Sequence, residues 1–191
     1  MINDFLSADE LKATGFKSTG DNVLVSRLAA FFNPGQISLG NNVRVDAFSL
    51  ISASKHVNIG SFTHISAGCF IYGSAGCELG DFTFMSPRSA IFSTSDDLSG
   101  RSLIGPMVPE KFRVELVNAP VVLEDHTGLG TNSTALPGVT LREGAIAGAH
   151  ALVTRDCDPW TIYGGAPAKP IKDRDRTCKD LGERCLAESA E

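Results

Sequence analysis

The sequence predicts an all-β protein, a parallel β-helix with three short strands in each turn. Four glycines stand twenty residues apart, Gly20, Gly40, Gly60 and Gly80, and each opens a similar phrase (GDNVLV, GNNVRV, GSFTHI, GDFTFM). Such a fixed period is typical of a solenoid. After a gap, degenerate copies continue as EDHTGL and REGAIA with the period shortened to eighteen, which is three hexads.

A six-residue register of aliphatic side chains supports this fold. The buried positions that it predicts are Leu39, Val45, Ile51, Ile59, Ile65, Ile71, Leu79, Met85, Ile91, Leu123, Leu129, Ala135, Leu141, Ala147 and Val153. A small or β-branched residue stands two positions before many of them, and the residue between, such as Arg44, His64 or Phe84, must face outward. A β-sandwich of short strands is the alternative, but it has no reason to keep one register through five units.

Short helices are expected to flank the β-helix. Residues 1–19 form an N-terminal helical cap, because Ser7 and Glu10 have capping-box spacing and Gly15 can end the helix. The β-helix domain covers residues 20–170. The charged tail of residues 171–191 carries apolar residues at helical spacing and predicts a C-terminal amphipathic helix.

One long excursion interrupts the repeat between residues 93 and 120. Long loops in regular solenoids are usually functional or disordered, and the apolar content of this one argues against disorder. We interpret it as a protruding arm that packs against another subunit; a tolerated surface insertion is the alternative.

Composition narrows the class of protein. The chain has 191 residues, 42% of them hydrophobic, which suits one compact domain. A net charge of −5 disfavours general nucleic-acid binding. The first residues lack the pattern of a signal peptide and no apolar run is long enough for a transmembrane segment, so a cytoplasmic location is expected. Five cysteines without metal-finger spacing predict free thiols.

Several motifs together resemble the hexapeptide-repeat acyltransferases, nearest the galactoside and maltose O-acetyltransferases and their relatives in surface-polysaccharide biosynthesis. They are the hexads, the polar loop, ALPGVTL, VTRD and GGAPAKPIK, and the likeness covers roughly residues 20 to 174. The resemblance implies a left-handed β-helix, a homotrimer, and acetyl-CoA as the acyl donor, bound between neighbouring subunits.

The resemblance also assigns donor-binding residues. Those expected to line the acetyl-CoA site are Thr131, Ala149, Thr154, Arg155, Gly165, Ala166, Lys169 and Lys172. Charge supports the last two independently, because a short segment of an acidic protein gathers Arg155, Lys169, Lys172, Arg174 and Arg176, and a ligand rich in phosphate needs such a field. A solvated, charged start of a helix is the alternative interpretation.

Acyl transfer needs a positioned acceptor, a base and an oxyanion donor. The family's catalytic histidine aligns with Asp96, a departure that leaves the base open. His64, which Asp96 and Asp97 can approach across a subunit boundary, and His126 are the two candidates; an unprotonated amine acceptor reacting by positioning alone is the third possibility.

The acceptor is expected to be a sugar or nucleotide sugar, modified at a hydroxyl or an amine. The resemblance makes Ser66 and Ser74 candidate substrate-binding residues, because they occupy places where the galactoside enzymes carry polar acceptor contacts. Arg88 is a third candidate, which binds a phosphate or pairs with Asp96 or Asp97. No metal site is predicted, since zinc in a carbonic-anhydrase-like relative would need three converging histidines. The alternatives to a sugar acetyltransferase are a non-catalytic scaffold and that metalloenzyme.

Overall fold

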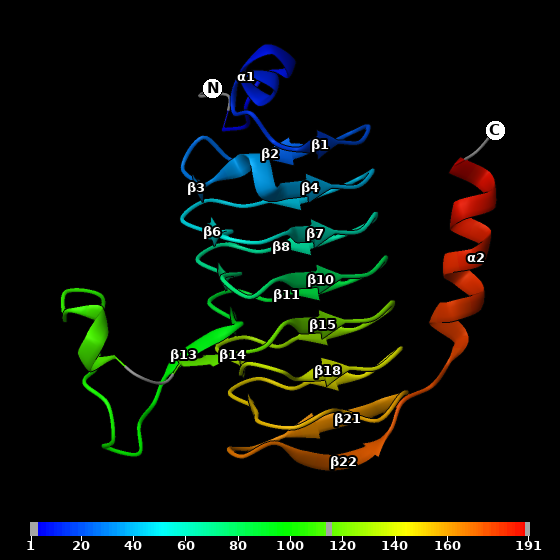
Figure 1. Cartoon of the computed structure of the whole chain (residues 1–191). Coiled ribbons are helices and arrows are strands. Elements are labelled where there is room, and N and C mark those ends of the chain that lie inside the picture. The colour runs from blue at the N-terminus through cyan, green and yellow to red at the C-terminus, as the bar shows by residue number, and fades with distance from the viewer. Residues whose placement is uncertain (1–3, 114–115, 190–191) are drawn as a thin grey trace.

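The computed structural model describes residues 4–113 and 116–189, and it confirms the parallel β-helix (Figure 1). Three sheets form the sides of a prism, and the chain passes through them in turn. Every pair inside the prism is parallel except the last pair of sheet two. Each turn therefore lies on the one before it and buries its inner face against it.

Sheet one contains six strands: β1 (Ser18–Thr19), β4 (Ile37–Leu39), β7 (Val57–Ile59), β10 (Cys77–Leu79), β15 (Val121–Leu123) and β18 (Thr140–Leu141). Sheet two contains eight: β2 (Leu24–Val25), β5 (Arg44–Val45), β8 (His64–Ile65), β11 (Phe84–Met85), β16 (Gly128–Leu129), β19 (Ile146–Ala147), β21 (Thr161–Gly164) and β22 (Lys169–Asp173). Sheet three contains six: β3 (Ala30–Phe32), β6 (Leu50–Ser52), β9 (Phe70–Tyr72), β12 (Ala90–Phe92), β17 (Thr134–Ala135) and β20 (Leu152–Val153).

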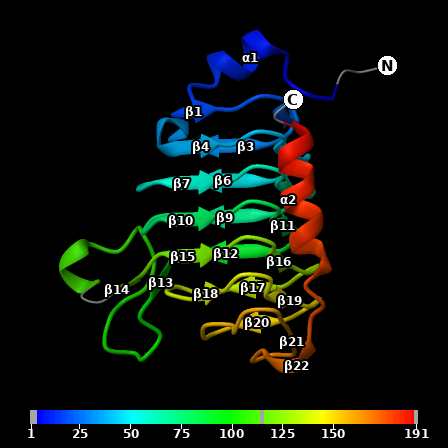
Figure 2. The same ribbon diagram turned by 90° about the vertical axis from the view of Figure 1, so that its right-hand side faces the viewer.

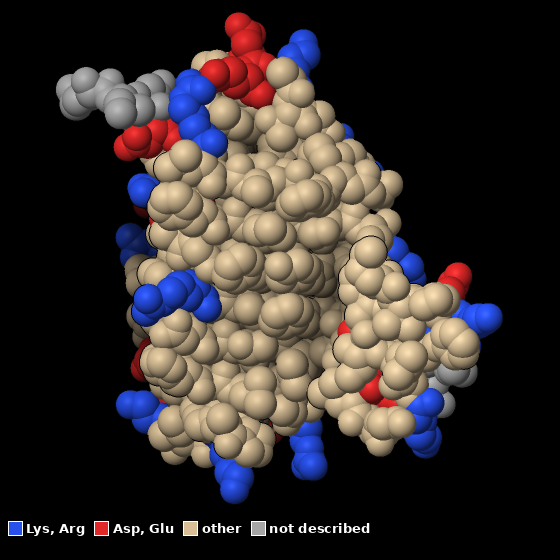
Figure 3. Space-filling model, turned by 90° about the vertical axis from the view of Figure 1, so that its left-hand side faces the viewer, with Lys and Arg blue, Asp and Glu red and all other residues tan. Residues whose placement is uncertain are grey.

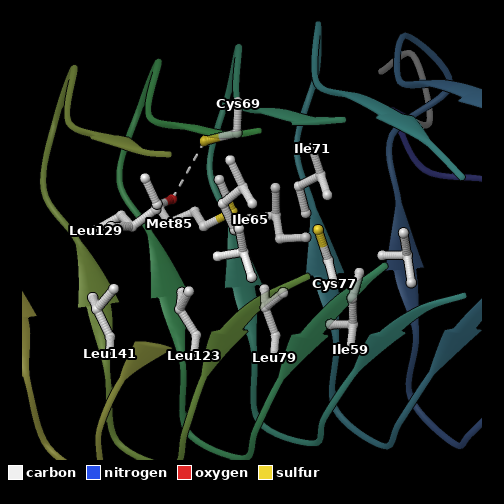
Figure 4. Close-up of a cluster of buried hydrophobic side chains, with 14 of the residues drawn as sticks. Ile59, Ile65, Cys69, Ile71, Cys77, Leu79, Met85, Leu123, Leu129 and Leu141 are labelled. Atoms are coloured by element: carbon white, nitrogen blue, oxygen red, sulfur yellow. Dashed lines mark hydrogen bonds between the residues drawn. The ribbon is translucent and has the colours of Figure 1, made fainter. Parts of the chain in front are cut away.

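The core confirms the six-residue register. In sheet two, Ile65, Met85 and Leu129 lie directly above one another, and all three are fully buried (Figure 4). Each of the fifteen aliphatic positions predicted to be internal is at most 3% exposed. Burial of a large aliphatic side chain stabilises a fold by about 1.5–3 kcal/mol, so the stacked columns supply most of the stability. The five cysteines are free, and burial raises the pKa of the Cys77 and Cys157 thiols to about 12.

Two of the prism's corners carry a residue with left-handed backbone in nearly every turn. The first corner, between sheets one and two, consists of Asn22, Asn42, Phe62, Phe82, His126, Gly144 and Trp160. The second corner, between sheets two and three, consists of Phe48, Gly68, Arg88, Asn132 and His150. Backbone hydrogen bonds link successive turns at both corners, for example from Arg88 N–H to Ala67 O at 3.1 Å.

The N-terminal cap matches its prediction. Helix α1 (Ala8–Ala13) begins with the expected capping box between Ser7 and Glu10, and Gly15 adopts φ +79° just beyond its end. Glu10 also holds Arg27 of the first turn in a two-pronged ion pair, with Oε2 and Nη2 2.6 Å apart. This pair fixes the cap on the prism.

The C-terminal tail contains the predicted helix, but the helix begins later than expected. Residues 171–173 belong to strand β22, which runs antiparallel to β21 after a turn at Gly165, and helix α2 (Thr177–Ser189) begins only later. Helix α2 then runs back along the first corner (Figure 2). Gly182 is its one buried residue among those described, because His126 and Phe82 pack against it.

Sheet three presents an uncharged outer face. Its strands contain no Lys, Arg, Asp or Glu (Figure 3), and the rings of Phe70, Tyr72 and Phe92 stack across two of its turns. The predicted arm leaves the prism beside this sheet as an antiparallel pair, β13 (Thr94–Asp96) and β14 (Leu116–Asn118). In the arm, Met107 is 93% exposed and Leu98 is 78% exposed.

Candidate active site

His64 lies on the outer face of sheet two and is held by a carboxylate. Its Nε2 lies 2.8 Å from Asp46 Oδ2, and Arg44 Nε donates to Asp46 Oδ1 at 2.7 Å. Burial opposes the ionisation of Asp46, but the hydrogen bonds from His64 and Arg44 outweigh it and hold the pKa of this carboxyl below its usual value. Because the carboxylate accepts from Nε2, Nδ1 is left as the ring's acceptor.

Asp46 is a residue that the sequence reasoning missed. The signal was present, since Arg44 pairs with His64 in the parallel ladder and Asp46 is two residues beyond Arg44, on the same face. The aspartates expected beside His64 lie elsewhere within the chain. Asp96 is in the arm, with its Oδ1 3.7 Å from Arg113 Nη2.

Asp97 caps a turn in the arm. Its carboxylate accepts from Ser99 Oγ at 2.6 Å and from Ser99 N–H at 2.9 Å, and these two bonds lower the pKa of Asp97. The described chain therefore does not join Asp96 or Asp97 to His64.

The second corner carries a ladder of polar side chains. Arg88 Nε donates to Asn132 Oδ1 at 3.0 Å, and Asn132 Nδ2 lies 3.4 Å from His150 Nε2. Arg88 thus pairs with an amide, and neither Asp96 nor Asp97 reaches it within the described chain.

Small residues lie beside this ladder, on the side of sheet two. Thr131 and Ala149, two predicted donor-binding residues, each precede a member of the ladder, and Thr131 O accepts from His150 N–H at 2.8 Å. A Cβ on Gly130 would stand 2.6 Å from Ala149 N, so only glycine permits this spacing of turns. The result is a surface that a thin ligand can follow along several turns.

Ser66 reaches the second corner, whereas Ser74 does not. Ser66 and Ser86 follow strands β8 and β11 in equivalent positions, one turn apart. Ser74 lies in the exposed turn after β9, at the third corner, between sheets three and one. Of the predicted acceptor contacts, the structure therefore groups Ser66 with Arg88.

Several predicted donor-binding residues gather at the C-terminal end of the prism. Gly165 and Ala166 lie in the turn between β21 and β22. Leu152 of β20 binds both sides of that turn: its N–H donates to Gly165 O at 3.0 Å, and its carbonyl oxygen accepts from Ala168 N–H at 2.8 Å. Lys169 begins β22, and Thr154 and Arg155 follow β20. Lys172 pairs with Ile162 nearer the first corner.

The predicted group of five cations is divided. Arg174 Nη1 donates to His126 O at 2.6 Å and to Gly144 O at 2.9 Å, and its guanidinium lies 5.7 Å from the Trp160 ring centre. Arg176 also lies over Trp160. These two arginines therefore belong to the first corner and hold the start of α2 there, which leaves Arg155, Lys169 and Lys172 for a phosphate.

His126 occupies a packing position. Its ring is parallel to Phe82 within 3°, with ring centres 5.0 Å apart, and Trp160 lies on the other side at 6.0 Å. Helix α2 covers the stack through Gly182. Trp160 is only 5% exposed, so it too packs at this end of the prism.

The second corner and the adjoining face of sheet two thus combine a carboxylate-held imidazole, a polar ladder and closely spaced small residues. In the described part of the chain, no group of three His, Cys, Asp or Glu side chains is placed to hold a metal ion. Nor does any described helix have the length and apolar character needed to cross a membrane. A prism of this kind has the fold of the hexapeptide-repeat proteins.

Comparison with known proteins gives the family. The chain is 36% identical to the dTDP-4-amino-4,6-dideoxy-D-glucose acyltransferase of Escherichia coli over 178 residues, which are 93% of this chain and 92% of that protein. It belongs to the hexapeptide-repeat acyltransferases and is an enzyme of that class. No family model matches the sequence.

Solved structures agree. AntD, an N-acyltransferase from Bacillus cereus solved with dTDP and 3-hydroxybutyryl-CoA, is 39% identical and superposes with a TM-score of 0.95 over 100% of both chains. A maltose O-acetyltransferase from Clostridium difficile 630 is 18% identical, with a TM-score of 0.62 over 92% of this chain and 79% of that one. The latter likeness shows the fold alone.

Proposed function

We propose that this enzyme transfers an acyl group from acyl-CoA to the amino group of a dTDP-linked amino sugar. The observation that carries the proposal is the full-length similarity to AntD, whose structures hold 3-hydroxybutyryl-CoA with dTDP, or coenzyme A with dTDP-4-amino-4,6-dideoxyglucose. The acceptor atom is then nitrogen, and the acyl chain need not be acetyl.

A pair of residues supports the proposal that this chain and AntD share a reaction centre. Solved variants of AntD replace either a serine or an aspartate, and those two positions are ten residues apart. In this chain, a serine followed ten residues later by an aspartate occurs only at Ser86 and Asp96. We assign both to the site, with Ser86 at the second corner and Asp96 supplied by the arm of a neighbouring subunit.

Each group has a role in the transfer. The amine attacks the thioester carbonyl, a C–N bond forms, the C–S bond breaks, and the coenzyme leaves as a thiol. Asp96 and Ser86 orient the amine, because a carboxylate and a hydroxyl can both accept its N–H bonds. His64 Nδ1 takes the proton, since Nε2 is occupied by Asp46. Thr131 and Ala149 line the pantetheine chain of the coenzyme, and Thr154 and Arg155 lie near its adenosine end. The small Gly165 and Ala166 allow close approach, and Lys169 and Lys172 bind the phosphates.

The site requires an assembly of three copies. The uncharged aromatic face of sheet three and the exposed apolar side chains of the arm both need a partner surface. Three prisms packed by sheet three would bring each arm to the second corner of the next subunit. Sedimentation should give a trimer, and a stable monomer would exclude a shared site.

The physiological setting proposed from the sequence remains a cytoplasmic step in making a surface-polysaccharide precursor. Loss of the gene should remove one N-acyl group from a surface glycan. An unchanged glycan would exclude this physiological setting but would leave the proposed reaction unaffected.

The reaction is tested by thiol release. With dTDP-4-amino-4,6-dideoxyglucose and either acetyl-CoA or 3-hydroxybutyryl-CoA, free thiol and N-acylated sugar should appear in equal amounts. A matched acceptor with hydroxyl in place of amine should give no release above hydrolysis. Transfer to the hydroxyl analogue alone would overturn the assignment to nitrogen.

A further inference from the structure

A column of buried polar side chains runs along the inner side of the second corner. Its members each stand immediately before a strand of sheet three, in successive turns, and each is at most 1% exposed: Ser49, Cys69, Ser89 and Ser133. Three of the four carry a hydroxyl and one carries a thiol. None of the roles assigned above uses this column.

The column binds main-chain carbonyl oxygens of the second corner. Ser49 Oγ donates to Ser66 O of the next turn at 2.9 Å. One turn further along, the equivalent group is the Cys69 thiol, whose Sγ lies 3.2 Å from Ser86 O. The residue that the thiol contacts from inside the prism is therefore the serine assigned to the reaction centre.

The Cys69 thiol acts as a hydrogen-bond donor. Burial raises its pKa above the usual value of a cysteine, so the sulfur keeps its proton. Besides Ser86 O, the sulfur contacts Met85 O at 3.6 Å (Figure 4) and Ser89 Oγ at 3.6 Å. Both carbonyl oxygens can only accept, so the S–H bond points toward them and the hydroxyl of Ser89 donates to the sulfur.

This contact completes the set of bonds that hold the main chain of Ser86. Its N–H donates to Leu129 O at 2.8 Å, and its carbonyl oxygen accepts from Ser89 N–H at 3.1 Å. Met85 points into the core, so the next side chain along, that of Ser86, points to the outer surface, where it is half-buried. The place of the Ser86 hydroxyl outside the prism thus depends on how its carbonyl group is held inside.

We propose that Cys69 is a positioning residue, which holds the carbonyl oxygen of Ser86 from within the prism and so keeps the Ser86 hydroxyl aligned with the acceptor amine. The inference rests on the proposed function, which places Ser86 at the reaction centre. A reaction that depends on positioning loses rate when a contact group shifts by a fraction of its hydrogen-bond length.

Steady-state thiol release by variants of the full-length protein tests this role. Cys69→Ala and Cys69→Val remove the donor with a smaller and a larger side chain. Both should lower kcat roughly twofold to fivefold, the effect of one weak hydrogen bond, and leave the donor KM unchanged. Cys69→Ser keeps a donor and should recover most of the rate. Cys77→Ala is the matched control, because Cys77 is an equally buried thiol on sheet one; it should lower the unfolding temperature and keep kcat.

A double-mutant cycle distinguishes positioning from a general weakening of the fold. Ser86→Ala removes the hydroxyl that Cys69 is proposed to place, so adding Cys69→Ala to Ser86→Ala should lower kcat no further. An equal loss in both backgrounds, or a Cys69→Ser enzyme as slow as Cys69→Ala, would overturn the role of Cys69. So would wild-type kcat in both Cys69→Ala and Cys69→Val.

These outcomes also separate the two proposals. If the wild type transfers the acyl group and the Cys69 variants fail to behave as expected, the positioning role is wrong and the proposed function stands. If the wild type transfers no acyl group from acetyl-CoA or 3-hydroxybutyryl-CoA to the amino sugar, the proposed function fails and the role of Cys69 fails with it.

Discussion

The first and second corners of the prism share one backbone and differ in what covers them. Both stack left-handed residues turn upon turn. At the first corner these residues are Phe62, Phe82, His126 and Trp160, and helix α2 lies on them. At the second corner they include Arg88, Asn132 and His150, whose polar groups bond to one another, and none of the described helices packs there.

This difference separates residues held in packing contacts from residues with exposed polar groups. His126 has a stacking partner on each side and its carbonyl oxygen bound by Arg174, so a structural role accounts for its surroundings. His64 has one nitrogen held by Asp46 and about half of its side chain exposed. The same residue type therefore has two different environments, according to the part of the prism that it occupies.

The largest expected effect contrasts these two histidines. His64→Ala should lower kcat about a hundredfold, the lower end of what a general base contributes, and leave the unfolding temperature nearly unchanged. His126→Ala should keep kcat and lose about 1 kcal/mol of stability, because an aromatic pair is broken. Steady-state thiol release and thermal unfolding distinguish the two variants. Full activity in His64→Ala would remove the proposed base.

Replacing the carboxylate of Asp96 in the arm should have the second-largest effect on activity. Asp96→Asn should lower kcat/KM by roughly tenfold to a hundredfold, since a hydrogen bond to a charged group contributes about 1.5–3 kcal/mol. Asp9→Asn on the exposed face of α1 is the control and should behave like the wild type. An Asp96→Asn enzyme of normal activity would show that the arm has no part in the reaction.

Gly182→Ala tests the contact that covers the first corner. Helix propensity alone favours alanine by about 1 kcal/mol. The added Cβ would stand 2.7 Å from His126 Cε1 and 3.2 Å from Phe82 Cε2, so we expect a net loss of about 1–2 kcal/mol from overpacking. The loss should disappear in the His126→Ala background. A gain in stability would mean that α2 does not pack on this corner.

The smallest effect concerns the N-terminal cap and its dependence on pH. Hydrogen bonds from Arg27, and then from Ser7, lower the pKa of Glu10 from 4.5 to about 2. A carboxyl with a lowered pKa stabilises the fold above its unfolded pKa and loses that effect as pH falls through the folded value. The difference in unfolding temperature between wild type and Glu10→Gln should be full at pH 7 and shrink between pH 4.5 and 2. A difference independent of pH would contradict the ion pair.

The fold was predictable because its information is local. Each aliphatic of the register, from Leu39 to Val153, is buried where the six-residue spacing places it. The capping box and the excursion are local signals as well. The pairing of His64 with Asp46 was missed, because Asp46 lies in the neighbouring turn and no short motif joins the two residues. The covering of His126 depends on the reversal at Gly165 and on the return path of α2, which no short motif determines.

A crystal structure with coenzyme A and dTDP tests the assignment of the two corners most directly. We expect the coenzyme along the second corner beside Thr131 and Ala149, with the nucleotide on the same corner. A coenzyme seated at the first corner, against Trp160 and α2, would contradict the account.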